Sequence, residues 1–168
     1  MKNRYSYGSL ASYLDLDALP IPVDWDAVFG RKAPLEVEIG FGTGEYLVGI
    51  ARQEPARNFI GFEQSAKRTL KALRKIFEAR IDNVRLLQVD AAGAFRCCFA
   101  PGAIDRVHCL FPCPWPKKRH AKHRLLSSGF LKLVNSRLKA GGVLRVVTDH
   151  APYAEWIVEE ASGSGFEM

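Results

Sequence analysis

The sequence predicts an α/β fold built on a mostly parallel sheet. Short apolar runs rich in β-branched residues alternate with segments of helical periodicity, and glycine-rich turns separate several of them. The chain has 168 residues, of which 48% are hydrophobic, so one domain can bury a substantial core. We therefore expect strands and helices to alternate along residues 34–168. An irregular leader over residues 1–33 is expected to pack on an edge of this domain.

Five apolar runs are the expected strands. They cover residues 35–39, 58–63, 84–90, 105–111 and 142–149. Each run has β-branched or long apolar residues at its centre, which is typical of strands that are buried on both faces of a parallel sheet.

Helices are expected between these runs, and the clearest covers residues 65–80. There Ala66, Leu70, Leu73 and Phe77 are spaced by four, three and four residues, so they form an apolar stripe with Lys and Arg opposite. Three further helices are expected: one after the first strand over residues 45–53, one ending at Gly141 and Gly142, and one starting near Pro152.

A glycine-rich turn follows the first strand in the sequence EIGFGTGE. Glycines there allow a ligand to approach the backbone, and the next helix offers free N–H groups. The spacing G-x-G-x-G places the third glycine one position too early for a dinucleotide site, which disfavours a nicotinamide enzyme. A tight strand-to-helix turn without a ligand is the alternative for the glycines alone.

Acidic residues lie near the carboxyl ends of the first three strands. Because ligands bind beyond the carboxyl ends of parallel strands, we expect Glu38, Glu63 and Asp90 at one site. Glu63 suits the hydroxyls of a ribose, and Asp90, followed by the small Ala91 and Ala92, suits the amino group of an adenine. Three acids without a phosphate cradle favour S-adenosylmethionine, whose adenosine, amine and sulfonium prefer carboxylates.

One segment of the chain carries positive charge without any acidic residue. The formal net charge is +6, yet residues 106–148 hold ten Lys or Arg and no Asp or Glu. This segregation favours a polyanionic partner, and a solvated basic surface is the alternative. The N-terminus does not resemble a signal peptide and no apolar run approaches the roughly 20 residues of a membrane span, so we expect a cytoplasmic protein.

The four cysteines are expected to be thiols, because their spacing is not that of a secreted disulfide framework. Cys109, Cys113, His120 and His123 are zinc-ligand residue types, but the gap between the two pairs is short and contains prolines. We expect no metal.

Five segments resemble the tRNA (guanine-N7)-methyltransferase family in order and spacing, from about residue 35 to residue 160: EIGFGTGE, GFE, VDAA, FPCPWPKKRHAKHR and VVTDHAPYAEW. The resemblance implies a Rossmann-like class I methyltransferase sheet, S-adenosylmethionine as the cofactor and a variable-loop guanosine of tRNA as the target. The resemblance implies that Glu38, Glu63 and Asp90 hold the cofactor, and the glycine turn and the small residue after Asp90 add Gly40, Gly42, Gly44 and Ala91 to the expected cofactor residues. The resemblance also implies that Lys117 and Asp149 contact the tRNA, and the basic run adds Arg119, His120, Lys122 and Arg124 to the expected substrate residues.

Two features of the chain depart from the family pattern. Cys113 stands where the family has an Asp with the catalytic role, so Cys113 takes the catalytic position here. The chain also stops where the family continues, so five of seven strands are expected, with the C-terminal strands missing. The protein would then be a monomer or homodimer, with an open sheet edge unless a partner subunit or the N-terminal leader covers it. A catalytically impaired or inactive relative that binds tRNA or S-adenosylmethionine is the alternative function.

Trp115 has two interpretations at this stage. It is either a structural prop beneath the loop or a platform against the target base.

Overall fold

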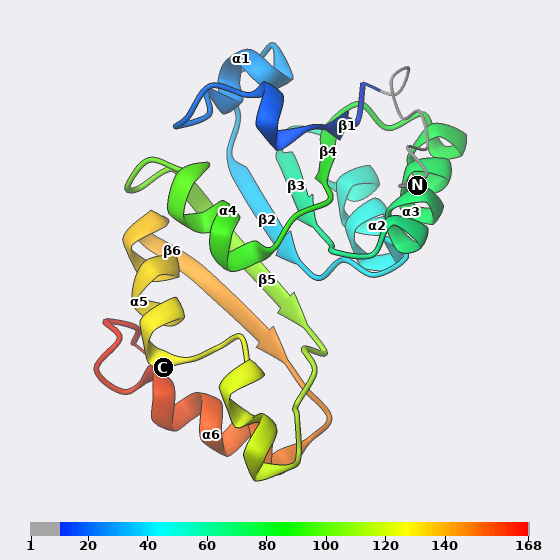
Figure 1. Cartoon of the computed structure of the whole chain (residues 1–168). Helices are drawn as coiled ribbons and strands as arrows, with labels where there is room; N and C mark the ends of the chain where they lie inside the picture. Colours follow the sequence, from blue (N-terminus) through cyan, green and yellow to red (C-terminus); the bar gives the residue numbers. More distant parts are fainter. Residues whose placement is uncertain (1–10, 168) are drawn as a thin grey trace.

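The computed structural model describes residues 11–167, which form a parallel sheet with helices on both faces (Figure 1). The strand order is β1-β4-β3-β2-β5-β6, and every neighbouring pair is parallel. The strands are β1 (Tyr13–Leu14), β2 (Leu35–Ile39), β3 (Asn58–Phe62), β4 (Val84–Leu87), β5 (Ile104–Leu110) and β6 (Leu138–Val147). The helices are α1 (Trp25–Phe29), α2 (Glu45–Gln53), α3 (Ala66–Ala79), α4 (Ala91–Cys97), α5 (Ser128–Arg137) and α6 (Ala151–Ala161), with two 3₁₀ segments, η1 (Leu16–Ala18) and η2 (Lys118–His123).

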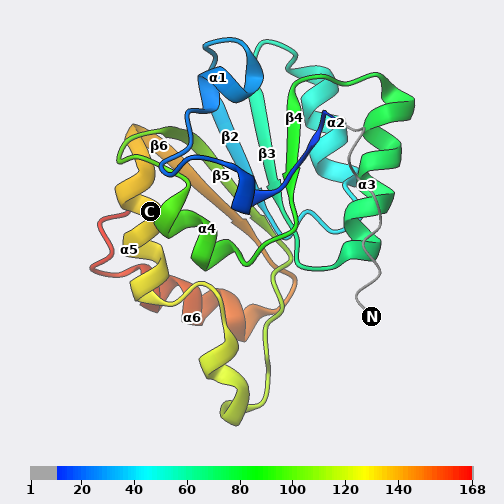
Figure 2. The same ribbon diagram turned by 45° about the horizontal axis from the view of Figure 1, so that its top comes forward.

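The helices form two layers around the sheet (Figure 2). Helices α2 and α3 pack on one face through Leu47 and Leu73, which join a core with Phe59. Helices α4, α5 and α6 pack on the other face in a larger core that includes Phe95 and Leu131. From β2 the chain first builds outward to β3 and β4, and it then returns to the other side of β2 to build β5 and β6. The order therefore reverses between β2 and β5, where open α/β sheets bind ligands.

The five expected strands are confirmed, and their bounds differ most at the end of β4 and at the start of β6. β4 stops at Leu87 rather than residue 90, and Asp90 instead caps α4, a helix that the sequence analysis missed. Gly141 and Gly142 do not stop a helix, because α5 ends at Arg137 and β6 already begins at Leu138. The two glycines lie where the pairing of β5 with β6 shifts register, and Gly141 has a positive φ of 74°. Glycines inside a strand commonly mark such a bulge.

The apolar stripe predicted for α3 is wrong in its orientation. Phe77 is 71% exposed, and the buried face of α3 is instead formed by Thr69, Ala72, Leu73 and Ile76. The reason is the glycine turn: the small Ala72 must face it so that the two segments can approach closely.

Residues 11–33 contain more regular structure than expected. β1 adds a sixth, two-residue strand beside β4 at the edge of the sheet, with Tyr13 opposite Leu86. In α1, the Trp25 ring stacks on Phe99 at 5.5 Å and its Nε1–H donates to the carbonyl of Cys98 at 3.1 Å. The first ten residues of the expected leader lie outside the described residues, and its boundary at residue 33 stays a prediction.

At the opposite edge, β6 has no strand on its outer side among residues 11–167. A partner subunit at this edge stays a prediction. No helix in this part of the chain is long and apolar enough to cross a membrane.

Candidate functional site

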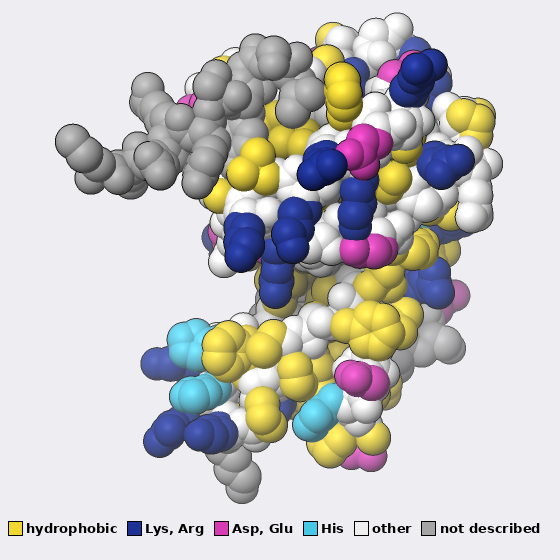
Figure 3. Space-filling view, turned by 90° about the vertical axis from the view of Figure 1, so that its right-hand side faces the viewer, with side chains coloured by type: hydrophobic (Ala, Val, Ile, Leu, Met, Phe, Trp, Pro, Cys, Tyr) yellow, Lys and Arg dark blue, Asp and Glu magenta, His cyan; other side chains and the backbone are white. Residues whose placement is uncertain are grey.

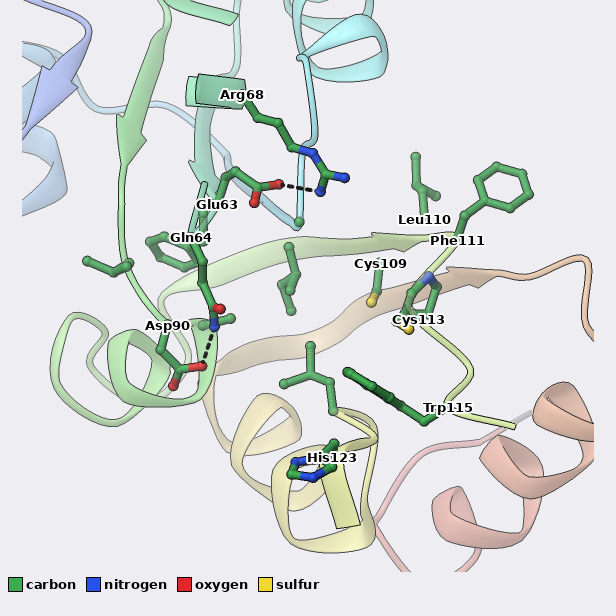
Figure 4. Close-up of a pocket in the computed structure, with 17 residues that line it drawn as sticks. Glu63, Gln64, Arg68, Asp90, Cys109, Leu110, Phe111, Cys113, Trp115 and His123 are labelled. Carbon is green, nitrogen blue, oxygen red and sulfur yellow. Dashed lines mark hydrogen bonds and ion pairs between the residues drawn. The ribbon is translucent and has the colours of Figure 1, made fainter. Parts of the chain in front are cut away.

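A cavity of about 500 Å³ opens beyond the carboxyl ends of β2, β3 and β5, at the point where the strand order reverses (Figure 4). Glu63, Gln64 and Asp90 line one side of it, and the residues after β5, including Cys113 and Trp115, line the other. This volume is within the range of small-molecule sites in proteins.

The glycine turn after β2 forms the floor of this region. Gly40 lines the cavity, and its N–H donates to the carbonyl of Phe62 at 2.8 Å. Gly44 has a φ of 83°, and a Cβ at this position would lie 2.8 Å from the Cβ of Ala72. Gly44 is therefore required both by its backbone conformation and by the close approach of α3. This packing sets the direction of α2, whose first turn begins at Glu45.

Glu63 is buried at the end of β3 and is held by backbone donors. Its Oε2 accepts from the N–H of Gly42 at 3.1 Å, and its Oε1 accepts from the N–H of Ser65 at 3.0 Å. Arg68 adds an ion pair at 3.7 Å. Because each carboxylate oxygen has two lone pairs, Glu63 keeps acceptor capacity for two hydroxyl groups.

Asp90 has a structural role beside its place in the cavity. Its Oδ2 accepts from the N–H of Gly93 at 2.9 Å and so caps α4, while its Oδ1 accepts from the amide of Gln64 at 3.1 Å. Ala91, the first residue of α4, lines the cavity next to it. The cap fixes the carboxylate at the cavity edge.

Glu38 does not line the cavity but lies buried beneath it in β2. Its Oε2 has no hydrogen-bond partner among the described residues. Burial, reinforced by the negative charge of Glu45, raises the pKa of Glu38 from its ordinary value of 4.5 to about 8. Burial also raises the pKa of the neighbouring Cys109 thiol, which does line the cavity, to about 12. A cationic ligand group would relieve the isolation of Glu38.

The segment after β5 turns sharply under backbone strain. Phe111 and Trp115 have φ values of 50° and 43°, in a region that residues with side chains rarely adopt. The N–H of Phe111 donates to the carbonyl of Val147 in β6 at 2.7 Å, which anchors the start of the turn. Between these two residues, Cys113 is exposed and lines the cavity.

Aromatic and cationic contacts then hold the segment in place. The Trp115 ring lies 5.7 Å from the His120 ring and 5.4 Å from the His123 ring. Arg124 donates from Nε to the carbonyl of Pro114 at 3.0 Å, and its guanidinium lies 4.8 Å from the centre of the Trp156 ring. The Arg124 guanidinium therefore interacts with groups of the protein itself.

The other predicted substrate residues lie at the surface. Lys117 precedes η2, and Arg119 and Lys122 are exposed within it. Asp149 is exposed just beyond the end of β6. None of these four lines the cavity, so they would contact parts of a ligand outside it.

The zinc-ligand residue types do not come together as a metal site. Within residues 11–167, no three His, Cys, Asp or Glu side chains are arranged to hold a metal ion. Cys109 is buried, whereas Cys113 is exposed.

The cavity also includes residues that the sequence analysis missed. Among them are Gln64, Arg68, Cys109, Phe111 and His123. Gln64 and Phe111 each follow the end of a strand, so the same rule that identified Glu63 could have found them. Arg68 and His123 are brought in by tertiary packing.

Comparison with known proteins connects this geometry to one family. Residues 32–167 match a family model described as "Putative methyltransferase". The chain is 41% identical over 145 residues to a tRNA (guanine-N(7)-)-methyltransferase of Thermotoga maritima, covering 86% of this chain and 46% of that protein. It is 45% identical over 147 residues to the protein of the same name from Acidovorax sp. (strain JS42), covering 88% of this chain and 59% of that protein. The chain thus spans about half of the length of these relatives.

A solved structure has the same fold at low sequence identity. It is described as an antibiotic related methyltransferase, with a TM-score of 0.64 and 19% identity, and the match covers 86% of this chain and 74% of that chain.

Proposed function

Because the chain belongs to this methyltransferase family, which its match over residues 32–167 shows, we propose that it transfers a methyl group from S-adenosylmethionine to N7 of a guanosine in tRNA. The proposal depends mainly on one observation, which is that the cavity and the basic loop lie next to each other. A cavity walled by the acidic residues of a nucleoside site opens directly against an exposed basic loop. We place the reaction in the cytoplasm, where tRNA is processed.

The residues around the cavity fit the cofactor. Glu63 retains acceptor capacity for the two ribose hydroxyls, and Asp90 and Ala91 are placed for an adenine ring. Glu38, with its unpartnered buried oxygen, fits the amine of the cofactor. S-adenosylmethionine supplies a methyl group that is activated by the positive sulfonium sulfur.

The chain's own task is to position a nucleophile that is already reactive. Guanine N7 carries a lone pair in the ring plane, so the new N–CH₃ bond forms as the sulfur–methyl bond breaks, with no proton to be removed first. Positioning then supplies much of the rate. The loop residues Cys113 and Trp115 line the cavity and would contact the guanine, while Lys117, Arg119 and Lys122 would hold phosphates outside it.

Cys113 favours a second candidate function. The methylated ring is cationic, and a carboxylate beside it would stabilise the charge that develops in the transition state, which a neutral thiol does not do. The exposed Cys113 thiol takes the place of that carboxylate. A protein that binds tRNA and S-adenosylmethionine with little or no turnover is therefore the alternative.

The deciding experiment measures transfer of labelled methyl from S-adenosylmethionine to an unmodified tRNA transcript. The unaltered chain is compared with Cys113→Asp, and Cys97→Asp outside the cavity is the matched control. We expect N7-methylguanosine in the product and a rate about tenfold to 100-fold higher for Cys113→Asp. Silence of the unaltered chain with activity in Cys113→Asp would support the binding-only alternative. Silence of all variants, or label in another base, would refute the proposed reaction.

A further inference from the structure

Helix α3 carries a second basic surface, on the opposite side of the cavity from the loop. Its 14 residues include five Lys or Arg and a single Glu. Lys67, Lys71 and Arg74 are exposed and follow one another at spacings of four and three residues, on the side of the helix opposite its buried residues. We call these three residues the α3 basic face.

Acidic neighbours neutralise only part of this charge. Arg74 pairs with Glu78 at 2.7 Å, in an exposed ion pair that contributes little to stability. Lys67 and Lys71 form no ion pair with any residue between 11 and 167. Their positive charges are available to a ligand.

The α3 basic face and the basic loop flank the same cavity. Figure 3 looks onto the side of the molecule where α3 lies above the loop, and it shows Lys and Arg side chains over the upper part and again beside the His side chains of the lower part. Among the described residues of the basic loop, Lys117, Arg119 and Lys122 are exposed cations. Arg68, in the first turn of α3, lines the cavity between the two groups.

We propose that the α3 basic face binds phosphates of the same RNA whose target guanosine enters the cavity. The inference rests on the proposed function and extends it, because it adds a second contact surface beyond the loop. Lys67 and Arg74 are seven residues apart, about 10 Å along the helix axis, which is enough to contact two successive phosphates of one strand. Lysine is a flexible point charge that suits such contacts, and phosphate contacts fix register without reading sequence.

The two basic surfaces would then bind different parts of the RNA. The loop orients the nucleotides next to the target, because its cations adjoin Cys113 and Trp115 at the cavity. The α3 basic face holds a part of the RNA on the far side of the cavity and so raises affinity without touching the reacting atoms. Its loss should weaken RNA binding and leave cofactor binding unchanged.

The test measures the affinity of an unmodified tRNA transcript at several salt concentrations. The double variant Lys67→Gln/Lys71→Gln is compared with Arg96→Gln/Lys132→Gln. This control removes the same charge from exposed positions on α4 and α5, on the other face of the sheet. Glutamine suits exposed helical positions, so both proteins should fold. Lys67→Arg/Lys71→Arg keeps the charge and should behave like the unaltered chain.

We expect the Lys67→Gln/Lys71→Gln variant to bind tRNA about tenfold more weakly and to lower the slope of log affinity against log salt by about two. The control should stay within about twofold, and S-adenosylmethionine should bind all variants equally. An unchanged affinity and slope in the double variant, with tRNA binding by the unaltered chain, would overturn this inference and leave the proposed function standing. No tRNA binding by the unaltered chain would overturn both.

Discussion

The two sides of the cavity are held in place by different forces. On the side formed by the ends of β2, β3 and β4, carboxylates accept hydrogen bonds from backbone and amide donors, as Glu63 and Asp90 do. On the side formed by the loop after β5, the Trp115 ring contacts the His120 ring edge to face and the His123 ring at a tilt, and Arg124 donates to the carbonyl of Pro114. The acidic side is part of the folded core, whereas the basic side is a surface loop attached to it.

This difference separates stability from substrate binding. Groups on the acidic side share their contacts with the packing of the sheet and helices, so we expect changes there to affect the fold and the proposed cofactor binding together. Exposed cations of the loop have few such contacts, so we expect changes there to affect only the proposed RNA binding. Four predictions test this separation, beginning with the largest expected effect.

Gly44→Ala should lower the free energy of unfolding by about 2–4 kcal/mol, because a side chain is strained at positive φ and the new Cβ would overlap Ala72. Urea unfolding measures the change. Gly49→Ala in the same helix is the control, because a Cβ there meets nothing within 4 Å, and it should leave stability equal or higher by up to about 1 kcal/mol. Equal stability of the two variants would show that the turn does not need Gly44.

Glu38→Gln should weaken S-adenosylmethionine binding by about tenfold to 100-fold, since Glu38 would lose its proton when the cationic cofactor amine binds beside it, whereas Gln cannot become charged. Isothermal titration calorimetry measures the affinity. Gln is nearly isosteric, so tRNA binding should be retained. Full affinity for the cofactor in this variant would show that Glu38 does not bind the cofactor amine.

The same substitution should change how stability depends on pH. The folded state holds a proton on Glu38 up to about pH 8, whereas the unfolded chain releases it near pH 4.5. Glu38 therefore makes the free energy of unfolding fall as pH rises from about 4.5 to 8. Gln carries no such proton, so the fall should be smaller in Glu38→Gln. Urea unfolding at pH 5 and pH 8 compares the two proteins, and identical slopes would contradict the buried, protonated state.

Arg124→Gln should have the smallest effect, about 1 kcal/mol of stability, because it removes a hydrogen bond within the loop and a ring contact between the loop and α6. Its tRNA affinity should fall without a change in salt dependence. The exposed Lys117→Gln should do the opposite, with unchanged stability and a salt slope lower by about one. Salt titrations of tRNA binding measure both, and a lower slope for Arg124→Gln would mean that this guanidinium contacts phosphate.

The expected strands and the main helices could be predicted because their signals are local. Apolar residues at strand or helix period, with glycine and proline at the breaks, placed β2, β3, β5, α2 and α3 within a few residues. The strand-end rule also placed Glu63 and Asp90 at one cavity, although Glu38, which the rule put there too, does not line it. These predictions needed only the order of residues and the geometry common to parallel sheets.

What depended on neighbours could not be predicted in this way. By local sequence rules, Gly141 and Gly142 predict the end of a helix. In the structure they lie in β6, because this segment pairs with β5. The side of α3 that is buried follows from the fit of Ala72 against Gly44, not from the most apolar stripe.

The sequence by itself determined which side chains are available for chemistry, because the acids, the glycine turn and the basic loop are fixed by residue type and spacing. The tertiary structure alone decided what each group does. Burial, which depends on residues distant in the chain, raises the pKa of Glu38. The Arg124 guanidinium packs against the Trp156 ring and so stabilises the loop instead of remaining a free surface cation. A cation stays available to a ligand only where it has no ion pair within the protein, as for Lys67 and Lys71 among the described residues.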